Sequence, residues 1–454
     1  MRREVGGFLL VVAAVATITF LRAPESYRFP SFNAEEGNIF FPIFYNGVRL
    51  GDVLYWPVLF YAMAVPIGIG WAISLLPVRH MPSAMVLAPL ALVSVTFAWL
   101  ALPRHRALFP TDGFRVVLCL VLAILPLAHY SLVSTVMSTH WIGFLALTLM
   151  LLVPLPSSTI SRVVQVGAMA MVVWSHPLCL ALLPAFAYRA ATARSRGERG
   201  TLLALAALAC LFPLLGTYHA DSRGASLAAG RVVATSFQVL AQKVVFESIF
   251  GNRLREVVLA RWGTWPFATV FAIVVGACGL AVWTTRRDRD REQWFLLGYA
   301  AYLCVVLPVL VVVLRGYPLD ALLSDWSQIY TFVPKVYVLL LLCMVGTALG
   351  RGRDWGLRWG RYAAVAALAW AGSVAVFNQS PYRCGPEAGV LIQHTIARLY
   401  QAERAAGGRD DVHLTVEDPI RRGWPIVIKT RSQWDTERRA RPWTFWWLRR
   451  PDAE

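Results

Sequence analysis

The sequence predicts an all-α polytopic membrane protein with about eleven transmembrane helices, carrying a small α+β extramembrane tail at its C-terminus. Of its 454 residues, 57% are apolar and only 15% are charged, whereas soluble domains have roughly 45–50% apolar and about 25% charged residues. The apolar residues gather in blocks of about 20, which is the length that crosses a bilayer core. Short Arg-rich or Pro/Gly-rich segments separate the blocks. Soluble, disordered and secreted disulfide-rich classes are therefore excluded.

The formal net charge of +17 is interpreted as a sign of membrane topology, and no nucleic-acid partner is expected. Arginine supplies 40 of the 43 basic residues, and most of these arginines flank apolar blocks, where they orient helices and contact anionic headgroups. The seven cysteines show no CxxC or Cys/His spacing. Neither a zinc site nor a disulfide framework is therefore expected.

The apolar blocks give the expected membrane helices in order. The first block lacks a small-x-small cleavage site, so we expect a membrane anchor and not a cleaved signal peptide. The helices are expected at 6–23, 53–76, 83–102, 115–129, 140–156, 163–188, 201–217, 264–284, 293–314, 335–349 and 362–377.

The basic clusters predict the orientation of these helices in the membrane. With Arg2 and Arg3 inside, the clusters at 189–199, 286–291 and 351–361 all fall on the cytoplasmic side, as the positive-inside bias requires. Arg104 and Arg106 oppose the bias, in the region 103–162 where short blocks leave the helix count open by one. The segments expected to face outward are 24–52, 218–263, 315–334 and 378–454.

Two outward segments and the tail carry expected structure of their own. Segment 31–50 is too polar to span and too aromatic for a free linker, which favours a short interfacial helix. Segment 231–250 has a similar pattern around Gln238, Lys243 and Glu247. Beyond the bundle of residues 1–377, the tail 378–454 is expected to be a small periplasmic domain. Its expected elements are a helix at 386–406 and two strands near 413–416 and 425–428.

The adjacent carboxylates Glu35 and Glu36 form the most informative motif, because they stand at the membrane surface before a run of aromatic residues. Burial and a neighbouring negative charge raise the pKa of a carboxyl group, which suits a general base. A solvated acidic loop that only orients the chain is the alternative interpretation.

An acidic pair in the first outward loop, an interfacial helix and a many-helix bundle together resemble the GT-C superfamily of membrane glycosyltransferases. The chain more closely resembles a group of bacterial membrane proteins that have a Glu-Asp-Gly-x-x-Phe motif. That motif stands here as Glu35-Glu36-Gly37-Asn38-Ile39-Phe40, with Glu36 in place of Asp. Shorter similarities are Ser138-Thr139-His140-Trp141, with His140 in place of Asn, Ser175-His176-Pro177, and Asp418-Pro419 followed by Gly423-Trp424.

The resemblance implies a bacterial inner-membrane protein with a polyprenyl-phosphate sugar as donor and a periplasmic or cell-surface glycan or lipid as acceptor. It assigns the catalytic base and its partner to Glu35 and Glu36, in an order that the motif does not fix. Transfer from a lipid phosphate also needs cations for the departing phosphate. Arg315 and Lys335, at facing ends of two successive apolar runs, are predicted to bind it. Snorkelling to lipid headgroups is the alternative for each.

The remaining polar candidates are predicted to bind substrate. Tyr317, Asp320 and Tyr330 lie between or beside the two predicted phosphate ligands, although interfacial anchoring explains the aromatic residues equally well. His140 lies in an expected membrane helix, where a polar residue is costly and indicates function by default. His176 before Pro177 is interpreted as a kink or as a functional residue.

No cofactor is predicted, because the chain lacks Walker, dinucleotide-binding and HExxH motifs. A divalent metal lacks a supporting ligand spacing, since His219 and Asp221 have no evident third ligand. The alternative function is a transporter or flippase for a lipid-linked sugar, which is expected to show repeats, broken helices or charges deep in the bundle. The sequence shows no repeat and the expected helix interiors are nearly free of charge, so the enzyme is favoured. A non-catalytic scaffold leaves the Glu35-Glu36 pair unexplained.

Overall fold

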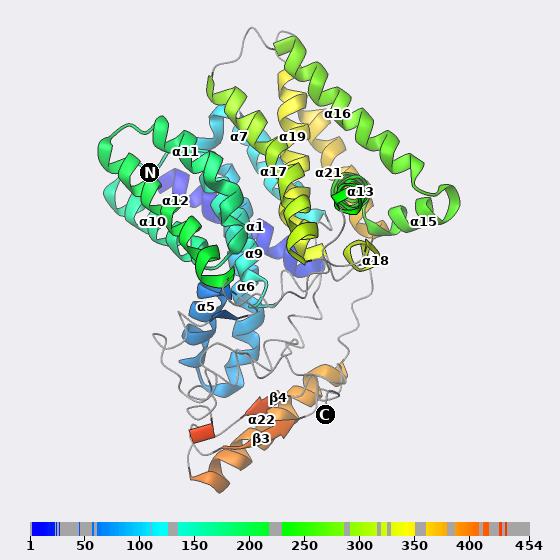
Figure 1. Ribbon diagram of the computed structural model, residues 1–454. Helices are drawn as coiled ribbons and strands as arrows, with labels where there is room; N and C mark the ends of the chain where they lie inside the picture. Colours follow the sequence, from blue (N-terminus) through cyan, green and yellow to red (C-terminus); the bar gives the residue numbers. More distant parts are fainter. Residues whose placement is uncertain are drawn as a thin grey trace.

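The computed structural model is a helical bundle, consistent with the predicted class of helical membrane protein (Figure 1). Among the described residues, five helices are long and apolar enough to cross a membrane, by length and composition: Val5–Arg22, Val78–Ala101, Gly230–Phe250, Trp265–Trp283 and Glu292–Val313. The structure describes residues 2–22, 24, 27, 45, 57–58, 61–109, 111–125, 135–217, 229–285, 291–315, 319–324, 328–349, 360–378, 386–407, 412–416, 426–428 and 432–433.

The first half of the chain contains mainly short helices. They are α1 (Arg2–Arg22), α5 (Ala64–Ser74), α6 (Met81–Ala98), α7 (Asp112–Ile124), α9 (Thr139–Met150), α10 (Thr159–Val173), the 3₁₀ helix η5 (Pro177–Leu182), α11 (Leu183–Ala191) and α12 (Arg196–Thr217).

The second half contains the longer helices and the tail. Its elements are α13 (Ala229–Gln238), the π-helix η6 (Val239–Phe246), α14 (Glu247–Phe250), α15 (Asn252–Trp262), α16 (Trp265–Thr285), α17 (Arg291–Arg315), α18 (Leu319–Leu323), α19 (Gln328–Leu349), α21 (Gly360–Phe377) and α22 (Pro386–Ala406).

One helix, α19, organises the site end of the bundle. It packs against α16 and α17 on one side, against η6 and α14 on another, and against α9 as well. In Figure 1, α16, α17 and α19 are seen from the side, whereas α13 is seen almost end-on, so α13 runs across their direction. The helix that contains α13, η6 and α14 therefore enters the bundle at a steep angle to its neighbours.

Two of the expected membrane helices are wrong. Residues 53–76 contain a short antiparallel pair of strands, β1 (Pro57–Val58) and β2 (Tyr61–Ala62), followed by α5 with only 11 residues. Pro57, the first residue of β1, lacks the amide hydrogen that a continuing helix requires. The expected helix 163–188 is divided, because α10 ends at Val173 and η5 begins at Pro177. His176 has an extended backbone, as the residue before a proline prefers.

The prediction that segment 231–250 lies at the membrane interface is also wrong. Every residue of η6 is buried, and this segment packs against α16, α17 and α19. The apolar spacing that predicted an interface in fact faces other helices.

The tail packs against the start of the bundle. A cluster of buried apolar residues joins Leu399 of α22 and Val412 to Tyr45 and to the region where α5 meets α6. The hydroxyl of Tyr45 also donates to Glu403 Oε1 at 2.6 Å. β3 (Leu414–Val416) pairs antiparallel with β4 (Ile426–Ile428), at the positions expected for two strands. We call this end of the bundle the tail end; whether 378–454 is a separate periplasmic domain stays a prediction.

Candidate functional site

Four charged side chains meet inside the bundle, between η6, α14, α15 and α19. Lys335 Nζ donates to Glu247 Oε2 at 2.7 Å, while Arg255 Nε and Lys243 Nζ lie 3.0 Å and 3.3 Å from Glu247 Oε1. The side chains are almost fully buried, with exposures of 6% or less. We call Lys243, Glu247, Arg255 and Lys335 the cation cluster.

The cation cluster has three positive charges and one negative charge among the described residues. The neighbouring carboxylate of Glu256 lies 4.0 Å from Arg255 and is 56% exposed, so water screens it. Burying charge without compensation is costly. A phosphate oxygen is a suitable acceptor for both ammonium and guanidinium groups, so this group of cations suits an anion bound beside Glu247.

Local backbone geometry brings three of these charges to one place. Lys243 and Glu247 are four residues apart on η6 and α14, and π-helical turns are frequent at functional sites. In an uninterrupted α-helix, Arg255 would be displaced from Glu247 by about 12 Å of helical rise. The chain instead turns at Gly251, whose φ is +81°, and this turn returns Arg255 to the carboxylate.

The choice of lysine at two of these positions is notable in a chain dominated by arginine. The sequence contains only three lysines against 40 arginines, and two of the three, Lys243 and Lys335, contact Glu247. An ammonium group is a compact point charge, whereas guanidinium is a planar fork with fixed geometry. The composition therefore indicates a local demand for a small cation at these two positions.

A second group of buried side chains lies where α9 meets α19. His140 and His176 stack with ring centroids 5.2 Å apart, and Trp141 contacts His176 at 4.4 Å and Tyr330 at 5.5 Å. Phe144 stacks on His176 at 4.6 Å. We call these five residues the histidine cluster.

Hydrogen bonds hold the two imidazoles in place. His140 Nδ1 contacts the carbonyl oxygen of Met137, and His176 Nδ1 accepts from the amide of Leu178 at 3.3 Å. Ser175 Oγ accepts from the amide of Val65 at 2.8 Å, which ties α5 to the break between α10 and η5. The division of the expected helix 163–188 thus positions His176 for its aromatic contacts.

The structure brings three of the predicted site residues together around α19. Lys335 belongs to the cation cluster, and Tyr330, five residues earlier on the same helix, belongs with His140 to the histidine cluster. One helix thus connects the two clusters, whose α19 members are separated by about 7.5 Å of helical rise.

The other predicted residues are not part of these clusters as described. Asp320 lies on α18 with an exposed side chain. Arg315 ends α17, and its side chain lies outside the described residues, as do Glu35, Glu36 and Tyr317. Their predicted roles stay predictions.

Sequence reasoning missed Glu247, Lys243 and Arg255 as site residues. A signal was present, because Lys243 and Glu247 are spaced by four residues in an apolar run, and ionisable residues in a membrane helix indicate function by default. The interfacial interpretation of 231–250 concealed it. The buried charges Lys243, Glu247 and Arg255 therefore lie in a segment that the prediction placed outside the membrane helices.

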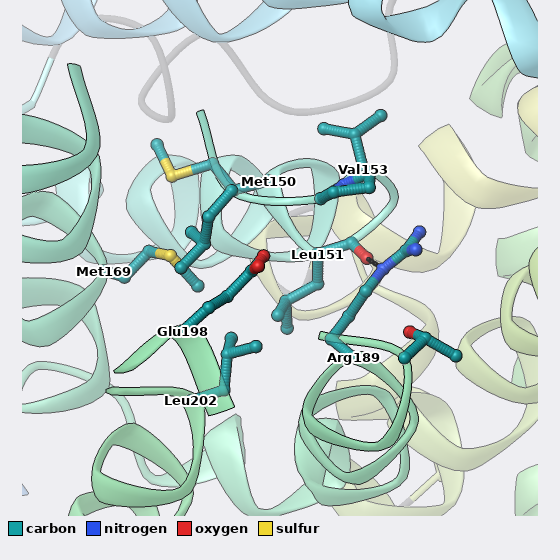
Figure 2. Close-up of a pocket in the computed structure, with 10 residues that line it drawn as sticks. Met150, Leu151, Val153, Met169, Arg189, Glu198 and Leu202 are labelled. Atoms are coloured by element: carbon teal, nitrogen blue, oxygen red, sulfur yellow. Dashed lines mark hydrogen bonds between the residues drawn. The ribbon is translucent and has the colours of Figure 1, made fainter. Parts of the chain in front are cut away.

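Figure 2 shows a separate hollow, lined by Met150, Leu151, Val153, Met169, Arg189, Glu198 and Leu202 among others. Its volume of about 10 Å³ holds about one water molecule. Arg189 donates there to the carbonyl of Leu151 at 2.8 Å and pairs with Glu292 at 2.6 Å. The carboxylate of Glu198 accepts from the amide of Arg194 at 3.0 Å, next to the start of α12. These contacts connect α11 to α17 and fix the start of α12. The hollow includes no residue of either cluster.

Within the described part of the chain, no three His, Cys, Asp or Glu side chains are close enough to hold a metal ion. That no cofactor is required stays a prediction. No protein-family model, no curated protein and no solved structure matches this chain. The chain is thus described by its fold and its buried charges: a helical membrane protein with a cation-rich internal site.

Proposed function

We propose that the protein is a GT-C-type glycosyltransferase, which moves a sugar from a polyprenyl-phosphate donor to a periplasmic or cell-surface glycan or lipid. The cation cluster is the observation that carries this proposal. Its three cations share one carboxylate inside an apolar bundle, an arrangement that suits a phosphate whose hydrocarbon tail lies among membrane helices. Lys335 was predicted for this role, and Lys243 and Arg255 join it.

The proposed reaction is a displacement at the anomeric carbon of the donor sugar. The acceptor hydroxyl forms the new glycosidic bond, its proton passes to Glu35 or Glu36, and the bond from the sugar to the phosphate oxygen breaks. The donor phosphodiester carries one negative charge, whereas the released monoester carries about 1.5 to 2 at neutral pH. Negative charge therefore develops at the phosphate, and buried cations stabilise that charge more in the transition state than in the ground state.

The remaining site residues are proposed to bind the sugar or the acceptor. His140 and Tyr330 lie in the histidine cluster. Tyr330 stands on α19 five residues before Lys335 of the cation cluster. Imidazole, indole and phenol rings combine stacking surfaces with hydrogen-bonding atoms. Tyr317 and Asp320 are proposed to contact the acceptor from the α17–α19 connection.

We also propose eleven membrane crossings with a cytoplasmic N-terminus, in a set that differs from the sequence prediction. The cluster of buried apolar residues at the tail end contains both Tyr45 and the α5–α6 region, which supports placing the segment between α1 and α6 outside. The crossing lost at 53–76 is regained because 163–188 divides into two. The proposed crossings are α1, α6, α7, α9, α10, η5 with α11, α12, α16, α17, α19 and α21. The candidate span Gly230–Phe250 is proposed to enter the bundle without crossing the membrane, so that both of its ends stay outside.

This revised topology removes the conflict with the positive-inside bias. Arg104 and Arg106 follow α6, and α6 now runs from the outside to the cytoplasm. Both arginines then join the cytoplasmic side, where the bias requires them. In Figure 1 the last turn of α16 and the first turn of α17 lie at the end opposite α22, which supports opposite sides of the membrane for these helix ends and for α22.

A transporter or flippase for a lipid-linked sugar is the second candidate, and the buried charges favour it more than the sequence did. Lys243 and Glu247 lie within the candidate span Gly230–Phe250, and the π-helix η6 interrupts the regular helix there. Intramembrane charges and broken helices are features of transporters. The two functions differ in whether the sugar–phosphate bond is broken.

The test is a reconstitution of the purified protein in proteoliposomes that contain a panel of undecaprenyl-phosphate sugars and cell-envelope glycan as acceptor. The enzyme is expected to release undecaprenyl phosphate, and the double variant Glu35→Gln/Glu36→Gln is expected to abolish this release while the protein still folds. Redistribution of the sugar lipid between leaflets without any release would instead establish the transporter. Release that persists in the double variant would reject the assignment of the base.

A further inference from the structure

A single carboxamide joins three helix ends beside the cation cluster. Asn378 follows α21, and its Oδ1 accepts a hydrogen bond from the amide of Arg253 at 2.8 Å. Its Nδ2 donates to the carbonyls of Phe250 at 3.2 Å and Val374 at 2.7 Å. Asn378 thus satisfies one of the open amides at the start of α15 and one of the open carbonyls at the end of α14, a role that capping side chains usually fill locally.

The local residue cannot fill this role because it is Gly251, which has no side chain. With φ at +81°, the backbone there is in a region that L-residues rarely adopt. A Cβ at position 251 would also collide with the carboxamide of Asn378. The glycine is therefore required twice, for the turn itself and for the space that Asn378 occupies.

The turn at Gly251 determines where Arg255 lies. Glu247 is three residues before Phe250, and Arg255 is two residues after Arg253, so Asn378 holds the backbone immediately on both sides of the turn. The product of this geometry is the 3.0 Å contact between Arg255 Nε and Glu247 Oε1. Arg255 is fixed on its other side by a 2.8 Å hydrogen bond from NH1 to the carbonyl of Leu323.

We propose that Asn378 is a positioning residue, which holds the α14–α15 turn and thereby aims the Arg255 guanidinium at the anion bound by the cation cluster. The identity of that anion as a lipid phosphate rests on the proposed function. The positioning itself does not, because it is defined by the contacts of Asn378 with Arg253 and Phe250.

The experiment is a double-mutant cycle on the full-length protein in nanodiscs, with affinity for undecaprenyl phosphate as the readout. Asn378→Ala is expected to weaken binding by about tenfold when Arg255 is present. In an Arg255→Gln background the same substitution is expected to change affinity by less than about twofold, because the group that it positions is gone. Asn252→Ala is the matched control, since it changes a neighbouring asparagine whose side chain donates to Glu256 Oε1 at 3.1 Å; it is expected to leave affinity unchanged.

Hydrogen exchange at the Arg253 amide gives a second readout that needs no ligand. This amide is expected to exchange slowly in the wild type and at least about tenfold faster in Asn378→Ala. Should Asn378→Ala fail to fold, Asn378→Ser, which keeps a hydroxyl acceptor, goes through the same measurements. Equal losses of affinity in both backgrounds, or unchanged exchange at Arg253, would overturn the positioning role. Failure of the wild type to bind undecaprenyl phosphate would reject the proposed function, and the exchange measurement would then decide the positioning inference alone.

Discussion

The proposed phosphate site depends on single charged residues. Lys335 is the residue at which this proposal can be tested most directly. Its ammonium group makes the shortest contact with Glu247 in the cation cluster, at 2.7 Å. Hydrogen bonds to charged groups are worth about 1.5–3 kcal/mol. We therefore expect Lys335→Met to lower the affinity for undecaprenyl phosphate by at least about tenfold, as measured by titration in nanodiscs.

Lys335→Arg separates charge from shape in this test. It restores the positive charge, but the planar fork does not fit a position built for a compact ammonium, so only partial recovery is expected. Arg261→Met is the control, because Arg261 is exposed on α15, the helix that carries Arg255. An unchanged affinity in Lys335→Met would remove Lys335 from the phosphate site.

His105 gives a prediction about pH that is independent of the proposed activity. It is fully buried in the segment after α6, and burial, with Arg104 and Arg115 adding to it, lowers the pKa of its imidazole to about 3. The unfolded chain binds a proton near pH 6.5, so between these values the unfolded state carries more protons. Stability from this residue is therefore complete above pH 6.5 and falls as the pH falls toward 3.

We expect the wild type to lose about 2 kcal/mol of unfolding free energy between pH 7 and pH 5 through His105. Thermal unfolding of the detergent-solubilised protein measures this as a fall in Tm that is smaller in His105→Gln. His80→Gln, which changes an exposed histidine in the turn before α6, is the control. Identical pH dependence in the wild type and His105→Gln would contradict the burial of a neutral imidazole.

At the scale of elements, the turn between α14 and α15 is the most constrained junction described. Gly251→Ala is expected to destabilise the protein more than Gly263→Ala, although both glycines have positive φ. A Cβ at Gly263 meets nothing within 4 Å, whereas a Cβ at Gly251 collides with Asn378. Backbone strain alone costs about 1–3 kcal/mol, so the excess in Gly251→Ala measures the collision. Equal shifts in Tm for the two variants would show that Asn378 does not occupy this space.

The sequence predicts elements well where one physical signal dominates. Long apolar runs without an internal proline, such as those of α1 and α16, are helices because every backbone group in a bilayer must be paired. The prediction fails at 53–76 and at 163–188, where prolines interrupt runs whose average hydropathy is still high. A composition average over such a window does not register a single missing amide donor.

The site was only partly predictable, for a different reason. Lys335 was identified because it stands alone at the start of an apolar run, but its partner Glu247 is 88 residues away in sequence. No local pattern connects two such positions. Arg255 was even harder to predict from the sequence, because its place in the site depends on a turn at Gly251 and on Asn378, which follows α21.

At the scale of the whole molecule, the proposed topology places Arg106 in the cytoplasm and α22 outside. Single cysteines at Arg106, whose side chain is 59% exposed, and at Tyr400 of α22, 39% exposed, test this in a background that lacks the native cysteines. In intact cells whose outer membrane is permeable to it, a maleimide that cannot cross the inner membrane is expected to label Tyr400→Cys. Arg106→Cys is expected to react only after the inner membrane is opened. Labelling of both positions in intact cells would reject the revised set of crossings.

The most direct test of the central claim is a structure of the purified protein in lipid nanodiscs with undecaprenyl phosphate. We predict a phosphate group within hydrogen-bond distance of Lys335 and Arg255, with its hydrocarbon tail between helices of the bundle. A cation cluster closed around Glu247 with no phosphate beside it, and the added lipid only in the surrounding bilayer, would contradict the account.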